Sequence, residues 1–237
     1  MQDVLTLIRE RQSARMPFEA ERSIGKQDLR QIMEAGRWAP TAHNMQNFEI
    51  IVVDDKTLLH TMGNIKHSVS DTFLQENYRQ LSFSEEELRR KKVGLLGTLF
   101  PPAWRTPGAR HNEAAAEEVM SRPIPPCSVL LVVVYDPRKR APASEGDFLG
   151  IMSLGCVMEN MWLMAQSLGI GFQIMSALSA DPVEEEIKSI LNIPDYLKIA
   201  FTARLGYPIA SSAKYLRVRR GVEDFTHHNR FGNKGIG

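Results

Sequence analysis

Val129–Tyr135 has the sequence VLLVVVY, an uninterrupted apolar run with Pro125-Pro126 before it and Asp136-Pro137 after it. The prolines interrupt regular structure on both sides, so the run has the length of one strand. β-branched residues dominate it, and a strand with no polar alternation is typically buried on both faces. We therefore expect a strand that is buried on both faces, in a sheet that helices cover.

Helix and strand signals alternate along the sequence around this run. The residues at 147–168 are apolar around most of a helix, so we expect a central, buried helix there. A second strong helix begins at Asp181, because Asp, Pro and Glu stand at positions that favour a helix N-terminus. The other expected elements are helices at 4–8 and from about Lys26, and strands at 48–53, 172–175 and 199–205. This alternation predicts an α/β or α+β fold.

Residues 56–122 differ from the rest of the chain because they are polar, rich in both charge signs and interrupted by Pro101-Pro102 and Pro107-Gly108. Such a stretch indicates a partly exposed helical excursion and not a second core. Long excursions from a compact domain often serve as lids or binding loops. We expect one domain over residues 1–237, with a helical lid at about 56–122.

The composition is that of a globular protein, and its charges nearly balance. The 237 residues include 29 Lys and Arg against 28 Asp and Glu, a formal net charge of +1. No overall excess of charge attracts the chain to nucleic acid or to an anionic membrane. The run Val129–Tyr135 is too short to span a bilayer, which needs about 20 residues. These features predict a cytoplasmic protein without nucleic-acid or membrane partners.

Several familiar catalytic signatures are absent from the sequence. No Gly-x-Gly-x-x-Gly follows an expected strand, and there is no Walker A motif, His-Glu-x-x-His or Gly-x-Ser-x-Gly. Cys127 and Cys156 are too few for a disulfide framework or a zinc site of their own, so we expect small, buried apolar residues in a strand and a helix. His227-His228 suits a surface tail better than a metal site. No metal is expected.

Two basic clusters lie near the ends of the chain. Arg11, Ser13 and Arg15 alternate, and alternate residues of an extended segment point the same way. Two guanidiniums and a hydroxyl could then converge on one phosphate. Arg217 and Arg219 repeat the alternation. From spacing alone, however, solvated surface arginines are the favoured explanation of both clusters.

The polar stretch at 41–47 lies between an expected helix and an expected strand. Its Asn44 and Gln46 side chains each carry donors and an acceptor, which suit the edge of a heterocycle. An ordinary helix-to-strand connection is the alternative, and the residues by themselves favour it.

In chain order, these pieces resemble motifs of the nitroreductase family, whose members are FMN-dependent oxidoreductases. Residues 11–15, RQSAR, are similar to the family's opening Arg-Arg-Ser-x-Arg, with Gln12 at the second position. Residues 39–48, APTAHNMQNF, resemble Ala-Pro-Ser-x-x-Asn-x-Gln-Pro-Trp, with Asn47 and Phe48 at the last two positions. The resemblance covers roughly residues 4–60 and 125–230.

Three further motifs complete the resemblance. Residues 165–171, AQSLGIG, are similar to the family's Ala-x-x-x-Gly-Leu-Gly, and residues 205–208 match Leu-Gly-Tyr-Pro. Residues 217–227 resemble the closing Arg-Arg-Pro-Leu-x-x-x-x-His, with Gly221 in place of Pro. The resemblance implies an α+β three-layer sandwich, with a mainly antiparallel central sheet flanked by helices, in an intertwined homodimer that has two FMN sites at its interface.

The resemblance also implies which residues bind FMN. One subunit would hold the phosphate and the ribityl chain, and its partner subunit would contribute the polar loop. Backbone and side-chain contacts near the reactive edge of the flavin would complete the site. The residues carried over are Arg11, Gln12, Ser13, Arg15, Pro40, Thr41, Ala42, Asn44, Gln46, Met175, Ser176, Ala177, Arg217 and Arg219.

The implied activity is that of an FMN-dependent NAD(P)H oxidoreductase, nitroreductase-like. It would reduce nitroaromatic or quinone-like acceptors by ping-pong hydride transfer through flavin N5. Because the flavin supplies the chemistry, the protein needs no catalytic side chain of its own. Three alternatives stay open: another flavin reaction on the same scaffold (reductive dehalogenation, flavin fragmentation or dehydrogenation), a flavin-binding protein without turnover, and a structural dimer without flavin.

Overall fold

The computed structural model describes residues 3–15, 17–19, 21–66, 86, 90, 124–142, 144, 146, 148–175, 178, 181–209 and 219–236. The chain divides into two compact units. The first comprises Met1–Ser68 and Val119–Ser212, and the second comprises Val69–Glu118 and Ala213–Gly237. Most of the lid expected at 56–122 lies outside the described residues. A single domain with such a lid therefore stays a prediction.

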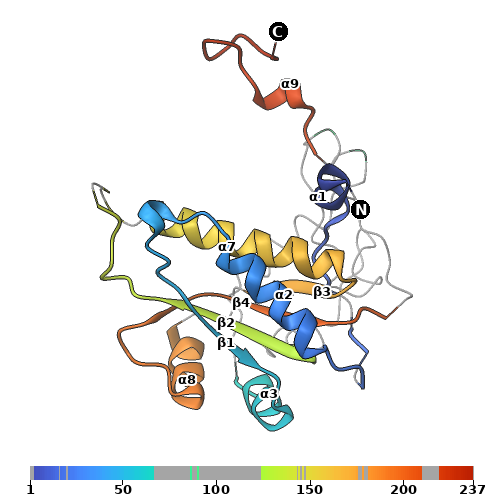
Figure 1. Ribbon diagram of the computed structural model, residues 1–237, viewed down its shortest axis with the longest axis vertical. Coiled ribbons are helices and arrows are strands. Elements are labelled where there is room, and N and C mark those ends of the chain that lie inside the picture. Colours follow the sequence, from blue (N-terminus) through green and yellow to red (C-terminus); the bar gives the residue numbers. More distant parts are fainter. Residues whose placement is uncertain are drawn as a thin grey trace. The chain divides into compact units, whose positions relative to one another are not determined.

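A four-stranded antiparallel sheet forms the centre of the first unit (Figure 1). Its strand order is β1-β2-β4-β3, and every neighbouring pair is antiparallel. The strands are β1 (Glu49–Val53), β2 (Val129–Tyr135), β3 (Gly171–Met175) and β4 (Lys198–Gly206). The apolar run VLLVVVY is the inner strand β2, and its burial on both faces is confirmed.

Helices cover both faces of this sheet (Figure 1). Helices α2 (Lys26–Arg37) and α7 (Phe148–Ser167) lie on one face, and α3 (Lys56–Gly63) and α8 (Asp181–Leu191) lie on the other. The alternation of β2 divides the core between them. Val129, Leu131 and Val133 join the core under α2 and α7, whereas Leu130, Val132 and Val134 join the core under α3 and α8. The expected three-layer α+β sandwich is confirmed.

Local sequence explains how several helices begin and how they pack. The Asp3 side chain accepts the Thr6 N–H at the start of α1 (Val4–Glu10), and Asp55 accepts the Leu58 N–H at the start of α3. Both are ordinary N-caps. Between α2 and α7, Gly36 permits close packing, because a Cβ there would lie 3.0 Å from Met161.

The expectation that α7 is central and fully buried is wrong for the single chain. Leu154, Val157, Met161, Trp162 and Ala165 are buried. Near its N-terminus, however, large apolar side chains are exposed: Phe148 by 69%, Ile151 by 58% and Met152 by 53%. Because α7 is apolar all round, packing one side on the sheet and α2 leaves the other side uncovered.

Among the described helices, α7 alone has the length and apolar composition of a membrane span. The core helix of a globular domain meets the same two criteria. Here the buried stripe of α7 packs against α2 and the sheet, which is the arrangement of a core helix.

The described part of the second unit, 219–236, folds on itself. It begins with α9 (Val222–Phe225), where the Asp224 carboxylate accepts the Gly221 N–H. The His227 ring stacks on Phe231 at 4.4 Å between centroids, and its Nδ1 accepts the Gly232 N–H at 3.0 Å. Among the described residues, no three His, Cys, Asp or Glu side chains gather as a metal site requires.

Candidate functional site

Residues 11–15, here called the arginine segment, lie along the free edge of β3. Ser13 forms a parallel bridge with Phe172, and the Ala14 N–H donates to the Phe172 carbonyl at 3.0 Å. This confirms the extended conformation expected up to Ser13. The Arg15 N–H then donates back to the Ser13 carbonyl at 3.0 Å, so the backbone bends there.

Arg11 and Gln12 fasten the arginine segment to α7. The Arg11 guanidinium lies 4.2 Å above the Trp162 ring, and its Nε is 3.2 Å from Oε1 of Glu159. The Arg11 side chain is 21% exposed. Trp162 donates from its indole nitrogen to the Gln12 carbonyl at 3.2 Å and stacks on Phe172. A cation–π contact and an ion pair therefore hold the first predicted phosphate ligand.

A buried arginine lies beneath the arginine segment. Arg204 of β4 is 2% exposed, and it donates from Nη2 to the Ala14 carbonyl at 3.1 Å. It also donates from Nε to Gln173 Oε1 at 2.5 Å and from Nη1 to the Pro126 carbonyl at 3.0 Å. Sequence reasoning missed this residue. The available signal was a single charge within the apolar strand predicted at 199–205.

Two glycines of the predicted family motifs create space beside Arg204. Gly171 of β3 and Gly206 of β4 are directly paired. A Cβ at Gly171 would lie 2.7 Å from the Phe18 ring, and one at Gly206 would lie 2.5 Å from it. Phe18 therefore packs against bare backbone at this end of the sheet. The Arg204 guanidinium lies 4.3 Å from the centre of the same ring.

Residues 40–48, here called the amide loop, contain a short 3-10 helix, η1 (Ala42–Asn44). His43, Asn44 and Gln46 have φ values of 51°, 54° and 47°. Left-handed conformations are uncommon outside glycine, although Asn and His adopt them more readily than most residues. Three of them within four residues give the loop a specific shape. Such conformations concentrate at binding sites.

Few side-chain contacts hold the amide loop. The Ala42 N–H donates to Ser153 Oγ of α7 at 2.9 Å, and the Gln46 N–H donates to Thr41 Oγ1 at 3.2 Å. Gln46 also donates from its amide to Asn44 Oδ1 at 3.1 Å. The two amides expected to contact a heterocycle thus lie side by side, and both residues are exposed.

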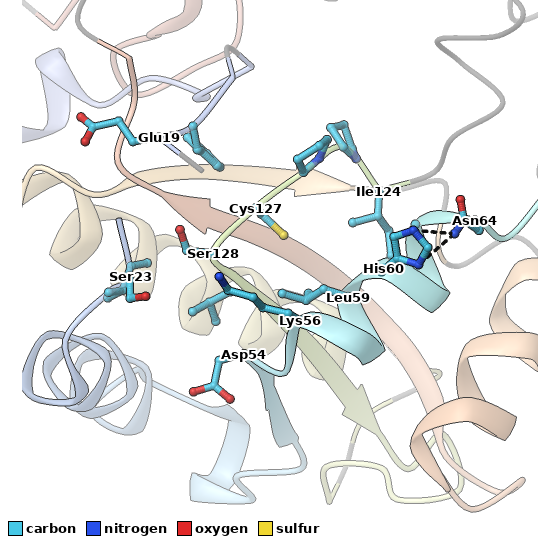
Figure 2. A pocket seen from close by; sticks show the side chains of 16 residues that line it. Glu19, Ser23, Asp54, Lys56, Leu59, His60, Asn64, Ile124, Cys127 and Ser128 are labelled. Atoms are coloured by element: carbon cyan, nitrogen blue, oxygen red, sulfur yellow. Dashed lines mark hydrogen bonds between the residues drawn. The ribbon is translucent and has the colours of Figure 1, made fainter. Parts of the chain in front are cut away.

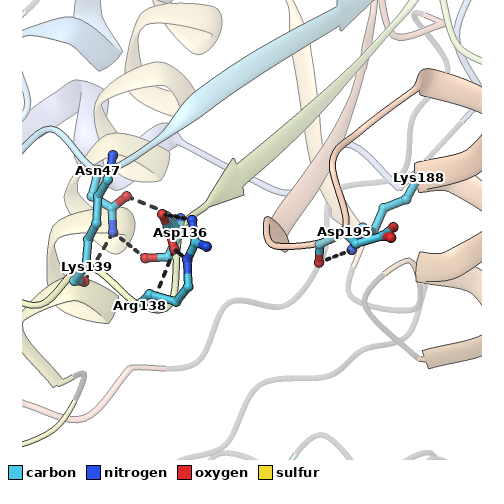
Figure 3. Close-up of polar contacts among 6 residues, drawn as sticks. All are labelled: Asn47, Asp136, Arg138, Lys139, Lys188 and Asp195. Carbon is cyan, nitrogen blue, oxygen red and sulfur yellow. Dashed lines mark hydrogen bonds and ion pairs between the residues drawn. The ribbon is translucent and has the colours of Figure 1, made fainter.

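Asn47 joins the far end of the amide loop to the turn after β2 (Figure 3). Its amide donates to the Asp136 carbonyl at 2.9 Å, and its Oδ1 accepts the Asp136 N–H at 3.2 Å. Arg138 donates to both carboxylate oxygens of Asp136 at 2.8 Å, and these bonds lower the pKa of Asp136 to about 2. Asn47 therefore has a clear structural role where the family motif has proline.

The arginine segment and the amide loop contact α7 at different positions along its axis. The loop bonds to Ser153, whereas the segment contacts Glu159 and Trp162. Six to nine helical residues correspond to about 9–14 Å along the axis. Within one chain, these contacts do not bring the two halves of the predicted site together.

The structure says less about the other predicted site residues. Met175 ends β3 and is partly buried. Arg219 is exposed and belongs to the second unit. Ser176, Ala177 and Arg217 lie outside the described residues. The assignment of these residues to a cofactor site stays a prediction.

A cavity of about 440 Å³ lies elsewhere in the first unit (Figure 2). Lys56, Leu59 and His60 reach it from α3, and Cys127 and Ser128 face them from the segment before β2. None of the predicted site residues lines it. Burial raises the pKa of the Cys127 thiol to about 11, so the thiol is protonated near neutral pH. A nucleophilic role at neutral pH is therefore disfavoured.

Both cysteines are free and only partly buried. Cys127 precedes β2, so the expectation of a strand cysteine is wrong, and Cys156 lies in α7 as expected. A second hollow, of about 20 Å³, lies at the amide loop between Thr41, Ala42 and Ser153. It is too small for a cofactor.

Comparison with known proteins finds relatives that are oxidoreductases. The NADPH-dependent oxidoreductase of Staphylococcus aureus strain USA300 is 21% identical to it over 203 residues. The match covers 86% of this chain and 64% of the relative, so the chain spans slightly less than two thirds of that protein's length.

Solved structures share the fold over nearly the whole chain. A nitroreductase with bound FMN from Desulfitobacterium hafniense DCB-2 has 22% identity and a TM-score of 0.59, and the match covers 97% of this chain and 100% of that one. A nitroreductase with bound FMN from Bacteroides fragilis NCTC 9343 has 18% identity and a TM-score of 0.58, with 93% and 96% covered. The sequence profile of the Nitroreductase family matches residues 8–207, from α1 to the residue after β4. The chain belongs to the nitroreductase family.

Proposed function

We propose that this chain binds FMN and works as an NAD(P)H oxidoreductase. The observation that carries the proposal is the arginine segment, which β3, α7 and Arg204 hold in place. A segment fixed on three sides presents its charged groups with little loss of entropy on binding. Guanidiniums and a hydroxyl form the donor set that a phosphate monoester requires.

The residues present fit the phosphate of FMN with one condition. Glu159 already forms an ion pair with Arg11, with 3.2 Å between Nε and Oε1. Phosphate binding would therefore exchange part of this ion pair for contacts of the guanidinium with the phosphate oxygens. Trp162 would keep the guanidinium plane in position during that exchange.

The proposed site needs a second copy of the chain. The amide loop and the arginine segment contact one α7 about 9–14 Å apart along its axis, and the family motifs imply that the loop over a given flavin belongs to the partner subunit. The exposed apolar residues near the N-terminus of α7 form a surface that a partner subunit would bury. We therefore propose a homodimer in which the amide loop of the partner subunit covers the isoalloxazine ring.

Each protein group has a defined task in this proposal. Arg11, Ser13 and Arg15 would hold the phosphate and ribityl chain with the backbone of Gln12, and Arg219 and Arg217 would add positive charge. Pro40, Thr41, Ala42, Asn44 and Gln46 of the partner would contact the ring, and Met175, Ser176 and Ala177 would line its reactive edge. When bound, FMN would accept hydride from NAD(P)H and pass it to a nitroaromatic or quinone-like acceptor.

The visible absorption spectrum of the purified protein is the first test. Two flavin bands, with FMN released at about one per chain, would support the proposal. A colourless protein that does not reconstitute with FMN would contradict it.

Kinetics then separate the possible reactions. Parallel double-reciprocal plots with NADH or NADPH and a nitroaromatic acceptor would support a shared, ping-pong site. Bound flavin that both nicotinamides fail to reduce would instead favour a different flavin reaction. If a mild chemical reductant also failed, the result would favour a flavin-binding protein without turnover.

A further inference from the structure

The peptide group between Ala14 and Arg15 is held from both sides. Its carbonyl accepts from Arg204 Nη2 at 3.1 Å, and its N–H donates to the Ser13 carbonyl at 3.0 Å. This peptide lies between Ser13 and Arg15, two of the proposed phosphate ligands. Its orientation sets the direction in which the chain leaves Ser13 and enters Arg15.

Arg204 is itself rigidly placed. It pairs directly with Gln173 across β4 and β3, and it bonds to that side chain and to the Pro126 carbonyl. The Phe18 ring packs against the guanidinium. At 2% exposure, the side chain has little room for alternative rotamers. Movement of Arg204 would therefore disturb several elements at once.

A purely structural explanation of Arg204 is unsatisfactory. Burying a guanidinium carries a large desolvation cost, and apolar residues of similar volume often stabilise a fold as well or better. The neighbouring Ala203 and Leu205 of β4 are buried and apolar. Beyond packing, Arg204 donates to Gln173 and to the carbonyls of Pro126 and Ala14, and the last of these bonds reaches the arginine segment.

We propose that Arg204 is a positioning residue for the phosphate site. It holds the Ala14–Arg15 peptide so that the Ser13 hydroxyl and the Arg15 guanidinium meet the same phosphate group. The inference rests on the proposed binding of FMN. It predicts that Arg204 governs recognition of the phosphate and not of the flavin ring.

The test compares FMN with riboflavin, which has the same ring and lacks the phosphate. Arg204→Gln removes the charge and the forked donor, and Arg204→Lys keeps the charge. Glu184→Ala is the matched control, because Glu184 is also buried and bonds to β4 at the Ile199 N–H, five residues from Arg204. Dissociation constants for both flavins are measured by fluorescence quenching at fixed ionic strength.

Arg204→Gln should weaken FMN binding about tenfold or more while changing riboflavin binding less than about threefold, because one charged hydrogen bond is at stake. Arg204→Lys should recover part of the loss. Glu184→Ala should not alter the ratio of the two constants. Hydrogen exchange of the Arg15 amide should accelerate in Arg204→Gln and not in Glu184→Ala, since only the former releases the peptide.

Three results would overturn the inference. Equal weakening of FMN and riboflavin by Arg204→Gln would mean that Arg204 supports the fold alone. Unchanged exchange at the Arg15 amide would mean that the peptide is held without it. A wild-type protein that binds neither flavin would reject the proposed function itself, which distinguishes that failure from the other two. If Arg204→Gln does not fold, Arg204→Lys with the same two measurements decides the matter.

Discussion

The arginine segment and the amide loop, two regions with adjoining roles in the proposed site, are built differently. The segment is bonded to β3, to α7 and to a buried guanidinium of β4. The loop takes its shape from three left-handed residues and is fastened mainly at its ends, by Ser153 and Asn47. One region is fixed by tertiary contacts, and the other by local backbone conformation.

This difference agrees with the tasks proposed for the two regions. A phosphate needs donors at fixed positions, because charge-assisted hydrogen bonds weaken rapidly with distance and angle. The amides at the loop are exposed and bonded to each other, and they would exchange that bond for contacts with a ring. Under the proposed function, the segment would bind the phosphate with contacts formed within one chain, whereas the loop would act on the flavin of the partner subunit.

Removing two proposed phosphate ligands, Arg11 of the segment and Arg219 near the end of the chain, should have the largest effect. Arg11→Ala combined with Arg219→Ala should abolish flavin retention, because two charged hydrogen bonds to phosphate correspond to at least about a hundredfold in affinity. FMN content after gel filtration is the measurement. Arg30→Ala, an exposed arginine of α2, is the control. Unchanged retention in the double variant would mean that the segment does not bind the phosphate.

A variant that separates the two proposed subunits tests whether FMN binding requires the amide loop of the partner subunit. Ile151→Glu places a charge in the exposed apolar surface of α7 and should yield monomers that bind FMN at least about tenfold more weakly. Sedimentation velocity and flavin titration measure the two effects. Leu58→Glu, on the exposed side of α3, is the matched control. A monomer with full FMN affinity would contradict the two-subunit site.

Two variants of Asn44 separate the effect of the loop's backbone conformation on FMN binding from the effect of the Asn44 side chain. Asn44→Gly keeps the left-handed conformation available, whereas Asn44→Ala does not, so Gly should be the more stable variant by up to about 1 kcal/mol. Both variants lose the amide and should bind FMN several-fold more weakly. Urea denaturation and flavin titration give the two quantities. A flavin affinity lost only in the Ala variant would show that shape alone matters.

The sequence predicts the fold well wherever the signal is local. The apolar run between prolines predicted β2 with its observed bounds, and the long apolar stretch predicted α7 to within one residue at each end, because each pattern reflects the burial of the element itself. The exposure of Phe148 and Ile151 was not predictable, since periodicity does not say which chain covers an apolar face.

The short motifs of the candidate site were predictable from the sequence, whereas the contacts between residues far apart in the sequence were not. Arg204 was missed because its partners at Ala14, Pro126 and Gln173 lie 31 to 190 positions away along the chain. The engagement of Arg11 by Glu159 was missed for the same reason. The left-handed backbone of the amide loop was also not predictable, because the only sequence feature that favours it is that Asn and His adopt this conformation more readily than most residues.

A variant of Glu159 tests whether its negative charge weakens the binding of a phosphate by the arginine segment. Glu159→Gln keeps an oxygen that can accept from Arg11 but removes a negative charge from the proposed phosphate site. FMN affinity should rise about two- to fivefold at low ionic strength, and the gain should shrink as salt screens it. Glu185→Gln, exposed on α8, is the control. A fall in affinity would mean that the carboxylate's charge orients Arg11.

The smallest effect concerns the attachment of the amide loop at Asn47. Asp136 has its pKa lowered from 3.8 to about 2, chiefly by the side-chain hydrogen bonds from Arg138. A lowered carboxyl pKa stabilises the fold above about pH 4, and this contribution is lost as the pH falls towards about 2. Exposure of Arg138 keeps the contribution small.

Asp136→Asn should therefore flatten the decline of the urea midpoint between about pH 4 and about pH 2, and it should leave the slope above that range unchanged. The measurement is urea denaturation of flavin-free wild type and variant across that interval. An identical acid dependence in both would mean that Asp136 titrates with an ordinary pKa. The attachment at Asn47 would then depend on the bonds between its side chain and the Asp136 backbone, which do not titrate.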